Sequence, residues 1–133
     1  MQEVVKAKNV KKTFVTGEVQ TQVLKGVDLT LFEGEFVAIV GESGSGKSTF
    51  LYILAGIDKA SEGQVELLGR DLATVSDDEL ARMRREDFSF VYQFDNLVPN
   101  LTVWENVTLP LVLDKKKESE YKDKVEEILE YLG

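Results

Sequence analysis

The sequence predicts an α/β fold, and three consecutive stretches carry this prediction. Residues 36–40 (FVAIV) form a short, continuous apolar run that is typical of a buried parallel strand. Residues 41–49 (GESGSGKST) are rich in glycine and serine. Residues 50–55 (FLYILA) suit a buried helix, which we expect to end at Gly56. A strand, a glycine-rich loop and a helix in this order indicate an α/β core.

The spacing within the loop is that of a phosphate-binding loop: Gly41, four residues, and then Gly46, Lys47 and Ser48. Gly41, Gly44 and Gly46 tolerate positive φ and have no Cβ, so the backbone can wrap and aim its N–H groups at one anion. A helix that begins near Gly46 adds its positive dipole end. We therefore expect Lys47 to reach the β- and γ-phosphates of a nucleotide and the Ser48 hydroxyl to bind Mg²⁺.

A flexible linker rich in glycine and serine is the alternative interpretation of residues 41–49. Flexible linkers are not flanked on both sides by apolar runs, whereas this stretch lies between two apolar runs that are suited to a protein core. The flanking runs therefore favour the phosphate-binding loop.

Composition excludes several other classes of protein. The chain has 133 residues, of which 43% are hydrophobic, so one domain with a core is expected and disorder is not. A net charge of −8 makes nucleic acid a poor partner. Without cysteine or histidine, neither disulfides nor a zinc site are expected. With no apolar run near the roughly 20 residues of a membrane helix and no signal-peptide pattern, we expect a soluble, cytosolic protein.

The chain before the loop predicts β-structure. We expect a strand over residues 4–10 that continues toward a turn near Gly17. Apolar residues at 27, 29 and 31 recur with period two and predict a second strand, followed by a tight turn at residues 33–34. Such a β-rich lead-in is unlike a small nucleotide kinase, where the loop usually follows the first strand.

Two further strands and a helix are predicted after the first helix. Residues 64–68 alternate between polar and apolar, and residues 88–92 (FSFVY) form an apolar run that ends at Gln93. Between them, Ser76 and Glu79 form a capping-box pattern that predicts the start of a helix. We expect the arginines of this helix to form a solvated face.

The last third of the chain predicts two helices joined by a charged connector. Thr102 is expected to cap a short helix over residues 101–107, and we expect Pro110 to break it. Residues 118–132 show helical periodicity. The apolar face of this helix consists of Tyr121, Val125, Ile128, Leu129 and Leu132.

Two stretches at a fixed separation resemble the ATP-binding subunit of an ABC transporter, most closely the MacB/LolD/FtsE type. The first is residues 24–29 (LKGVDL) followed by residues 33–41 (EGEFVAIVG), which lead into the loop, the family's Walker A. The second is residues 90–93 (FVYQ) with residues 96–99 (NLVP) and 101–107 (LTVWENV), which resembles the family's Q-loop segment. The loop alone would indicate only a P-loop nucleotide-binding protein, and the second stretch makes the resemblance specific.

The resemblance implies a P-loop NTPase core with an N-terminal antiparallel β subdomain and the start of a helical subdomain. We assign residues 1–133 to a single, incomplete nucleotide-binding domain of this type. Within it, residues 1–35 would be the β-rich lead-in, residues 36–93 the P-loop core, and residues 94–133 the Q-loop with a partial helical subdomain.

The resemblance also implies which residues contact ATP and Mg²⁺. Phe14 sits where the family places an aromatic side chain that stacks on adenine, although an ordinary sheet-packing phenylalanine is an equal alternative. Gln93 sits where the Q-loop glutamine reaches Mg²⁺ and the attacking water, with a solvated strand end as the alternative. The expected ATP-binding residues are Phe14, Gly41, Ser43, Gly44, Ser45, Gly46, Lys47, Ser48, Thr49 and Gln93, with Ser48 and Gln93 at the Mg²⁺.

The partners implied by the resemblance are a membrane permease and a second ATP-binding subunit in a dimer. The permease would contact the Q-loop region, residues 94–103, at the inner face of the cell membrane. No nucleic acid is expected as a partner.

The segments that the family uses to complete hydrolysis are not among these 133 residues. The family continues with a Leu-Ser-Gly-Gly-Gln signature, a Walker B aspartate, a catalytic glutamate and a switch histidine. Because phosphoryl transfer needs a positioned nucleophile, we predict that this chain alone binds Mg-nucleotide but does not hydrolyse it efficiently. The alternative is a truncated P-loop module that folds and self-associates without useful turnover.

Other P-loop enzymes fit the sequence less well. A GTPase would carry an Asn-Lys-x-Asp guanine motif, which is absent.

Without the family's later strands, the strands expected at residues 36–40 and 88–92 would have an open edge. We expect another chain or a swapped element to cover that edge.

Overall fold

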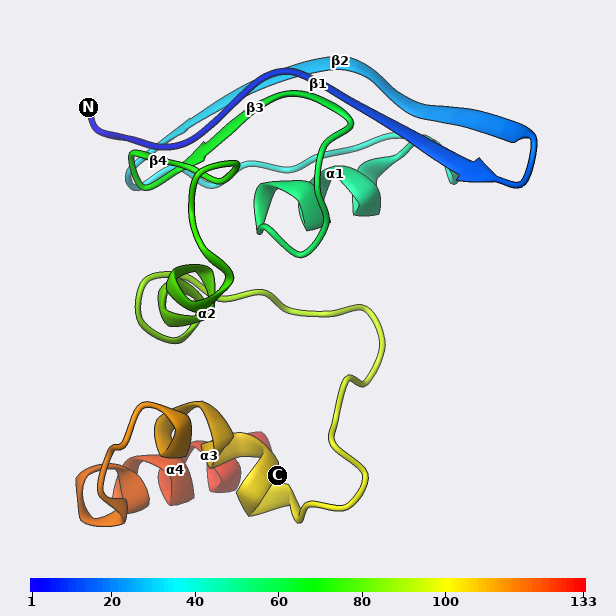
Figure 1. Ribbon diagram of the computed structural model, residues 1–133. Coiled ribbons are helices and arrows are strands. Elements are labelled where there is room, and N and C mark those ends of the chain that lie inside the picture. Colours follow the sequence, from blue (N-terminus) through cyan, green and yellow to red (C-terminus); the bar gives the residue numbers. More distant parts are fainter. The chain divides into compact units, whose positions relative to one another are not determined.

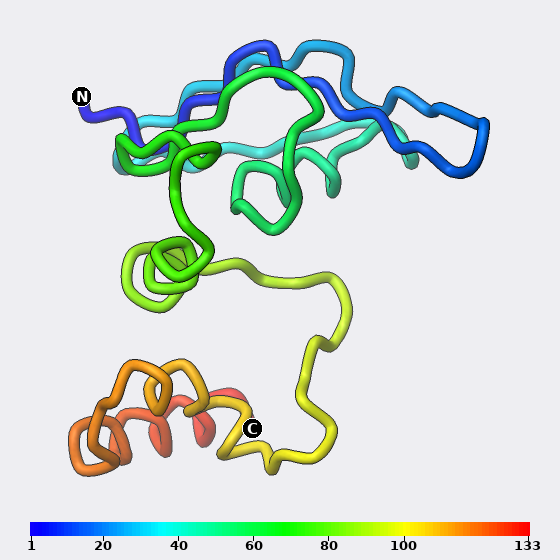
Figure 2. The backbone as a smooth tube through the Cα atoms, in the orientation of Figure 1, coloured from blue at the N-terminus to red at the C-terminus, as the bar shows by residue number.

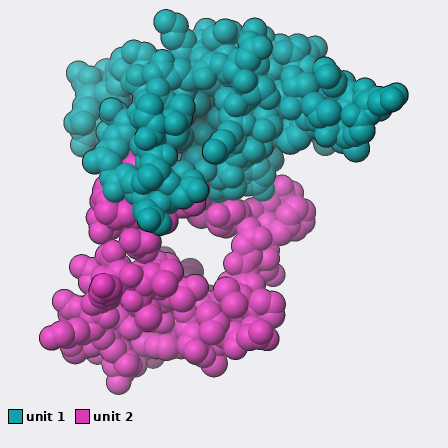
Figure 3. All heavy atoms as spheres, viewed as in Figure 1, with its two compact units in different colours: residues 1–80 teal, residues 81–133 magenta.

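The computed structural model describes residues 1–133. Figure 1 shows its helices and strands, Figure 2 the course of its backbone, and Figure 3 the two compact units into which the chain divides. Unit 1 is Met1–Leu80 and unit 2 is Ala81–Gly133. The helix α2 (Asp77–Glu86) spans the boundary between them.

A four-stranded antiparallel sheet forms most of unit 1 (Figure 1). Its two long strands are β1 (Glu3–Thr16) and β2 (Val19–Phe32). The shorter β3 (Glu62–Leu67) pairs with β1, and β4 (Arg70–Asp71) pairs with β3, which gives the order β2-β1-β3-β4. The predicted antiparallel β subdomain is therefore confirmed.

The strands form where period-two patterns and turn residues coincide. Thr16 pairs with Val19, so β1 and β2 are joined by a two-residue loop whose first residue, Gly17, has φ +63°. Tight hairpin loops of this length favour glycine at a positive φ. The strands predicted over residues 4–10 and 64–68 are confirmed, and the first continues to the hairpin turn at Gly17, as predicted.

Helix α1 (Lys47–Leu54) covers one face of the sheet (Figure 1). Its side chains Phe50, Ile53 and Leu54 are buried, and each such burial contributes about 1.5–3 kcal/mol. They share one core with Ala7, Val10, Leu24 and Val65 of the strands. The helix ends at Ala55 before Gly56, as predicted.

The buried strand predicted over residues 36–40 does not form, so that prediction is wrong. The segment runs without strand structure between β2 and α1 (Figure 1), and Phe36 is 99% exposed. A strand that is apolar on both faces needs hydrogen-bonding neighbours and a cover on each face. The sheet of unit 1 contains no strand that pairs with this segment.

The strand predicted over residues 88–92 is also absent, for the same reason. Val91 is 92% exposed and no strand of the structure pairs with it. The rings of Phe90 and Tyr92 lie with centroids 4.9 Å apart, as side chains two positions apart in an extended backbone do. The segment therefore belongs to no strand of the sheet, and the open sheet edge that we predicted for these two strands is not formed.

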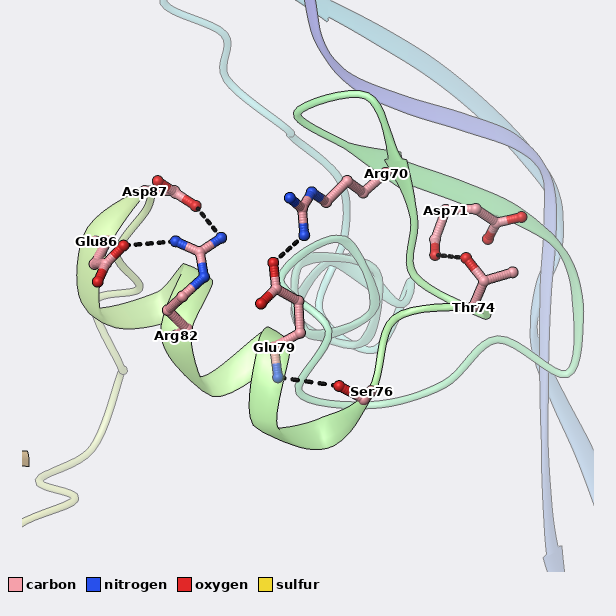
Figure 4. Close-up of polar contacts among 8 residues, drawn as sticks. All are labelled: Arg70, Asp71, Thr74, Ser76, Glu79, Arg82, Glu86 and Asp87. Carbon is pink, nitrogen blue, oxygen red and sulfur yellow. Dashed lines mark hydrogen bonds and ion pairs between the residues drawn. The ribbon is translucent and has the colours of Figure 1, made fainter. Parts of the chain in front are cut away.

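The helix predicted to start at Ser76 is confirmed as α2. The Ser76 hydroxyl accepts a hydrogen bond from the Glu79 amide at 3.2 Å, and the Glu79 carboxylate pairs with Arg70 (Figure 4). In the same view, Arg82 pairs with Glu86 at 2.5 Å and with Asp87 at 3.5 Å. The solvated arginine face thus includes local ion pairs, which we did not predict.

Helix α3 (Val103–Leu113) begins at the predicted cap but is not broken by Pro110, so that prediction is wrong. Proline removes one helical N–H donor. Pro110 lies in the last turn, where its carbonyl still accepts the Asp114 amide at 3.0 Å. The loss is therefore confined to a single hydrogen bond, and the helix continues to Leu113.

Helix α4 (Glu118–Leu132) has the bounds that we predicted. Val125 is buried and Tyr121 and Leu129 are half-buried, whereas Ile128 and Leu132 are exposed. The buried face is therefore narrower than the periodicity indicated. None of the helices combines the length and the apolar character that crossing a membrane requires.

Candidate nucleotide-binding site

The loop before α1 has the backbone conformation that its glycines predicted. Gly44 and Gly46 have φ +80° and +97°, a region that favours glycine. Gly41 meets a different constraint, because a Cβ there would lie 2.7 Å from Ser45 Oγ. The Ser45 amide donates to the Glu42 carbonyl at 3.1 Å and closes a turn inside the loop. The segment is therefore curled rather than extended.

Gly46 also fixes the loop against the sheet. A Cβ on this residue would lie 2.9 Å from Leu24 Cδ2 and 2.9 Å from Val23 Cγ1, both on β2. Leu24 is buried in the core that α1 also enters. The start of α1 is thus in close contact with a rigid hairpin, which sets the position of the loop within unit 1.

The first turn of α1 presents backbone N–H groups without partners inside the helix. Gly46 is the N-cap, and the amides of the first turn have no intrahelical acceptor. No side chain caps this end, and no acidic residue lies in the first turn. The positive end of the helix dipole is therefore open to an external anion.

The Lys47 ammonium lies over the loop. It donates to the Gly41 carbonyl at 2.8 Å, to the Glu42 carbonyl at 2.6 Å and to Ser45 Oγ at 3.3 Å. All three acceptors are neutral, and charged phosphate oxygens make stronger hydrogen bonds with an ammonium group. The lysine can exchange these contacts for a phosphate without leaving the loop.

Accessible side chains complete the loop. Ser43 and Ser48 are exposed, and Thr49 is half-buried. Ser48 lies in the first turn of α1, so its hydroxyl can reach a cation bound beside phosphates in the loop. These residues fit a Mg-nucleotide, because the site offers amides and a cation to phosphate and a free hydroxyl to Mg²⁺.

Phe14 lies on β1 opposite Thr21 and is 42% exposed. It is not part of the core cluster, so the sheet-packing alternative has no support in burial. The Lys12 ammonium lies 5.1 Å from the centroid of the ring. An exposed ring of this kind can offer a face to a flat ligand.

Gln93 belongs to unit 2, on the unpaired segment after Val91, and is exposed. Its role beside Ser48 stays a prediction. The loop residues therefore lie together in unit 1, whereas Gln93 belongs to unit 2.

Sequence reasoning missed the environment of Lys12. Its ammonium pairs with Asp58 at 3.1 Å and donates to the Lys59 carbonyl at 2.7 Å, both just after α1. One signal was available: Lys12 and Phe14 are two positions apart on a predicted strand, which places them on one face.

The curled loop, the open helix terminus and the lysine over the loop define a P-loop nucleotide-binding protein. Comparison with known proteins gives the family. The family model described as "ABC transporter" matches residues 24–133, and the chain belongs to that family.

Similar curated proteins are ATP-binding components of bacterial transport systems. The chain is 44% identical over 126 residues to the macrolide export ATP-binding/permease protein MacB of Bdellovibrio bacteriovorus, covering 95% of this chain and 19% of that protein. It is 42% identical over 130 residues to the lipoprotein-releasing system ATP-binding protein LolD of Alcanivorax borkumensis, covering 98% of this chain and 57% of that protein. The chain thus spans only part of each relative.

Similar solved structures include the ATP-binding cassette MJ0796, a dimer in a post-hydrolysis state bound to ADP and Pi. It matches with a TM-score of 0.76 and 50% identity, over 82% of this chain and 47% of that chain. The P-loop fold class predicted from the sequence is therefore confirmed for the N-terminal portion of such a cassette.

Proposed function

We propose that this chain binds ATP with Mg²⁺ and contributes to the energy-coupling subunit of an export-type or extrusion-type ABC transporter. The observation that carries the proposal is the Lys47 ammonium, which lies over a curled loop at an uncapped helix terminus. The names of the MacB and LolD relatives support the transport role.

The geometry assigns a part of the ligand to each group. Amides of residues 44–49 would bind the β- and γ-phosphates, and Lys47 would neutralise their charge. The Ser48 hydroxyl would hold Mg²⁺, which screens the negative charge of the phosphates when bound. We propose Gln93 as a further contact of the Mg²⁺, as the family resemblance implies.

Adenine would stack on Phe14. The loop contacts β2 at Val23 and Leu24 through Gly46, and Leu24 pairs with Lys12, two residues before Phe14. The ring therefore lies roughly 7 Å along β1 from the strand position that faces the loop. This short separation supports one ligand that reaches both.

We expect binding without efficient turnover by these 133 residues alone. The resemblance supports this expectation, because the family's catalytic glutamate and switch histidine match no residue of this chain, which contains no histidine. In the complete transporter, we propose that a permease contacts residues 94–103 and that a second ATP-binding subunit forms a dimer. The assembly would lie at the inner face of the cell membrane.

The alternative function is association without useful nucleotide turnover. The exposed apolar side chains of residues 36–40 and of the unpaired segment around Val91 favour it. A molar mass that rises with protein concentration in light scattering, together with no detectable ATP binding, would select this alternative.

Calorimetric titration with ATP in the presence and absence of Mg²⁺ tests the proposal. Lys47→Ala should weaken ATP binding about 10- to 100-fold, since a charge-assisted hydrogen bond contributes about 1.5–3 kcal/mol. Lys25→Ala removes an equal charge from an exposed position on β2 and should leave binding unchanged. Equal binding by both variants, or strong turnover that survives Lys47→Ala, would contradict the proposal.

A further inference from the structure

We propose that Lys12 is a positioning residue for the adenine ring. Its ammonium lies 5.1 Å from the centroid of Phe14, within the range of a cation–π interaction. The inference rests on the proposed function, because it takes Phe14 as the residue on which the base stacks. Lys12 would hold one face of the ring so that the other face receives the base.

The ammonium of Lys12 is itself held in place. It pairs with Asp58 Oδ1 at 3.1 Å and donates to the Lys59 carbonyl at 2.7 Å. Asp58 Oδ1 also accepts the Lys59 amide at 2.8 Å, which fixes the carboxylate. The Lys12 side chain is only 14% exposed, compared with 32% for the adjacent Lys11. The cation is thus a fixed support rather than a mobile surface charge.

Phe14 needs such a support, because nothing in the core holds it. The residue is 42% exposed and lies outside the core cluster, near the end of the hairpin. An exposed ring that samples several rotamers would lose that freedom when a base stacks on it, and this loss weakens binding. A cation that already restricts the ring removes part of the cost before the ligand arrives.

The support also ties the ring to the phosphate loop. Asp58 and Lys59 follow the C-terminal end of α1, and the phosphate-binding loop includes the first residues of this helix. At the other end of α1, Gly46 contacts Leu24, the residue that pairs with Lys12 across the hairpin. The segment after α1 therefore contacts Lys12, and the residue before α1 contacts the cross-strand partner of Lys12. These two contacts keep the Phe14 ring and the loop at a fixed separation.

The test compares MgATP with Mg-tripolyphosphate, which has phosphates but no base. Lys12→Met should raise the Kd for ATP about 2- to 5-fold, as expected for a partly exposed cation–π contact, and leave the Kd for tripolyphosphate unchanged. Lys12→Arg keeps the cation and should restore ATP binding. Lys11→Met removes a lysine that is ion-paired to Glu62 instead, and it should affect neither ligand.

Two results would overturn the inference. Equal weakening of both ligands by Lys12→Met would show that the lysine acts as a general positive charge. Unchanged ATP binding would show that it does not position the base. Neither result affects the proposed function, which the Lys47→Ala titration tests separately. If the wild-type chain binds neither ligand, the proposed function fails and the inference falls with it.

A measurement without nucleotide tests the geometry directly. In proton NMR, the ε-methylene protons of Lys12 should be shifted upfield by the Phe14 ring current, and the shift should vanish in Phe14→Leu. In that background, Lys12→Met should no longer alter ATP affinity. Ordinary chemical shifts for these protons in a folded wild-type chain would contradict the contact.

Discussion

Gly46 carries two structural requirements in one residue. Its φ of +97° belongs to the left-handed region, and a Cβ would lie 2.9 Å from both Leu24 and Val23. The first requirement costs a non-glycine residue about 1–2 kcal/mol, and the second forces a shift at the junction of loop and sheet. Gly34 meets only the first requirement, so the two can be separated.

Gly46→Ala should therefore destabilise unit 1 more than Gly34→Ala. Gly34 has φ +83° with nothing within 4 Å of its Cβ position, so Gly34→Ala introduces only backbone strain and no steric overlap. We expect Gly46→Ala to lower the free energy of unfolding by about 1–3 kcal/mol beyond Gly34→Ala, as overpacking does. Denaturant unfolding of both variants measures the difference. Equal losses would mean that the contact with β2 does not constrain the loop.

The capping box at the start of α3 changes the acidity of Glu105. The Thr102 amide donates to it at 3.1 Å, and the Thr102 hydroxyl accepts the Glu105 amide at 3.1 Å. The bond from the Thr102 backbone, and then the interaction with its side chain, lower the pKa of Glu105 below its ordinary value. A depressed pKa means that the folded state favours the charged carboxylate, so this stabilisation is complete above the ordinary pKa.

We predict that α3 loses this contribution as the pH falls through the lowered pKa of Glu105. Thr102→Ala removes the hydroxyl but keeps the backbone amide, so it should raise the pKa of Glu105 only part of the way toward its ordinary value, measured by NMR titration of the side-chain carboxyl carbon. Glu105→Gln keeps a side-chain acceptor without a titrating group, so fraying of the first turn of α3 should lose this pH dependence. A wild-type Glu105 that titrates at its ordinary pKa would contradict the assignment.

Whether a helix or strand could be predicted from the sequence depends on where its structural partners lie. The hairpin of β1 and β2 and strand β3 were predicted because their period-two patterns find partners within unit 1. The starts of α2 and α3 were predicted because Ser76 and Thr102 mark them locally. Residues 36–40 and 88–92 have a strand-like composition but no backbone partner in the sheet, so composition alone could not make them strands.

Amide hydrogen exchange tests this division. Amides of residues 36–40 and of Val91 should exchange within the first time point, since no strand protects them. Amides of β1 around Ala7 should be protected, because β1 is flanked by β2 and β3. Strong protection at residues 36–40 would mean that the segment forms a paired strand in solution.

Helices α3 and α4 show where local signals are incomplete. Pro110 indicated the end of α3, but the cost of a proline depends on its position, and in the last turn it is one hydrogen bond. The periodicity of α4 marked five apolar positions, whereas burial depends on what the rest of unit 2 places against them. A helix cap depends on neighbouring residues in the sequence and could be predicted. The burial of a helix face depends on distant residues and could not.

At the scale of the whole molecule, the site was predictable to the extent that it is contiguous. Residues 41–49 follow each other in the chain, so their spacing alone indicated their geometry. The support of Phe14 by Lys12, Asp58 and Lys59 joins β1 to the segment after α1 and depends on the packed unit. The i, i+2 spacing can place Lys12 and Phe14 on one face of β1, but no local pattern brings Asp58 and Lys59 to Lys12.

The most direct test of the central claim is an amide NMR titration of the full chain with MgATP. We predict that the largest shift changes fall on the amides of residues 44–49 and that Lys47→Ala needs about 10- to 100-fold more MgATP to produce them. Unchanged loop amides at saturating MgATP, or the same changes at the same MgATP concentrations in Lys47→Ala, would contradict the account.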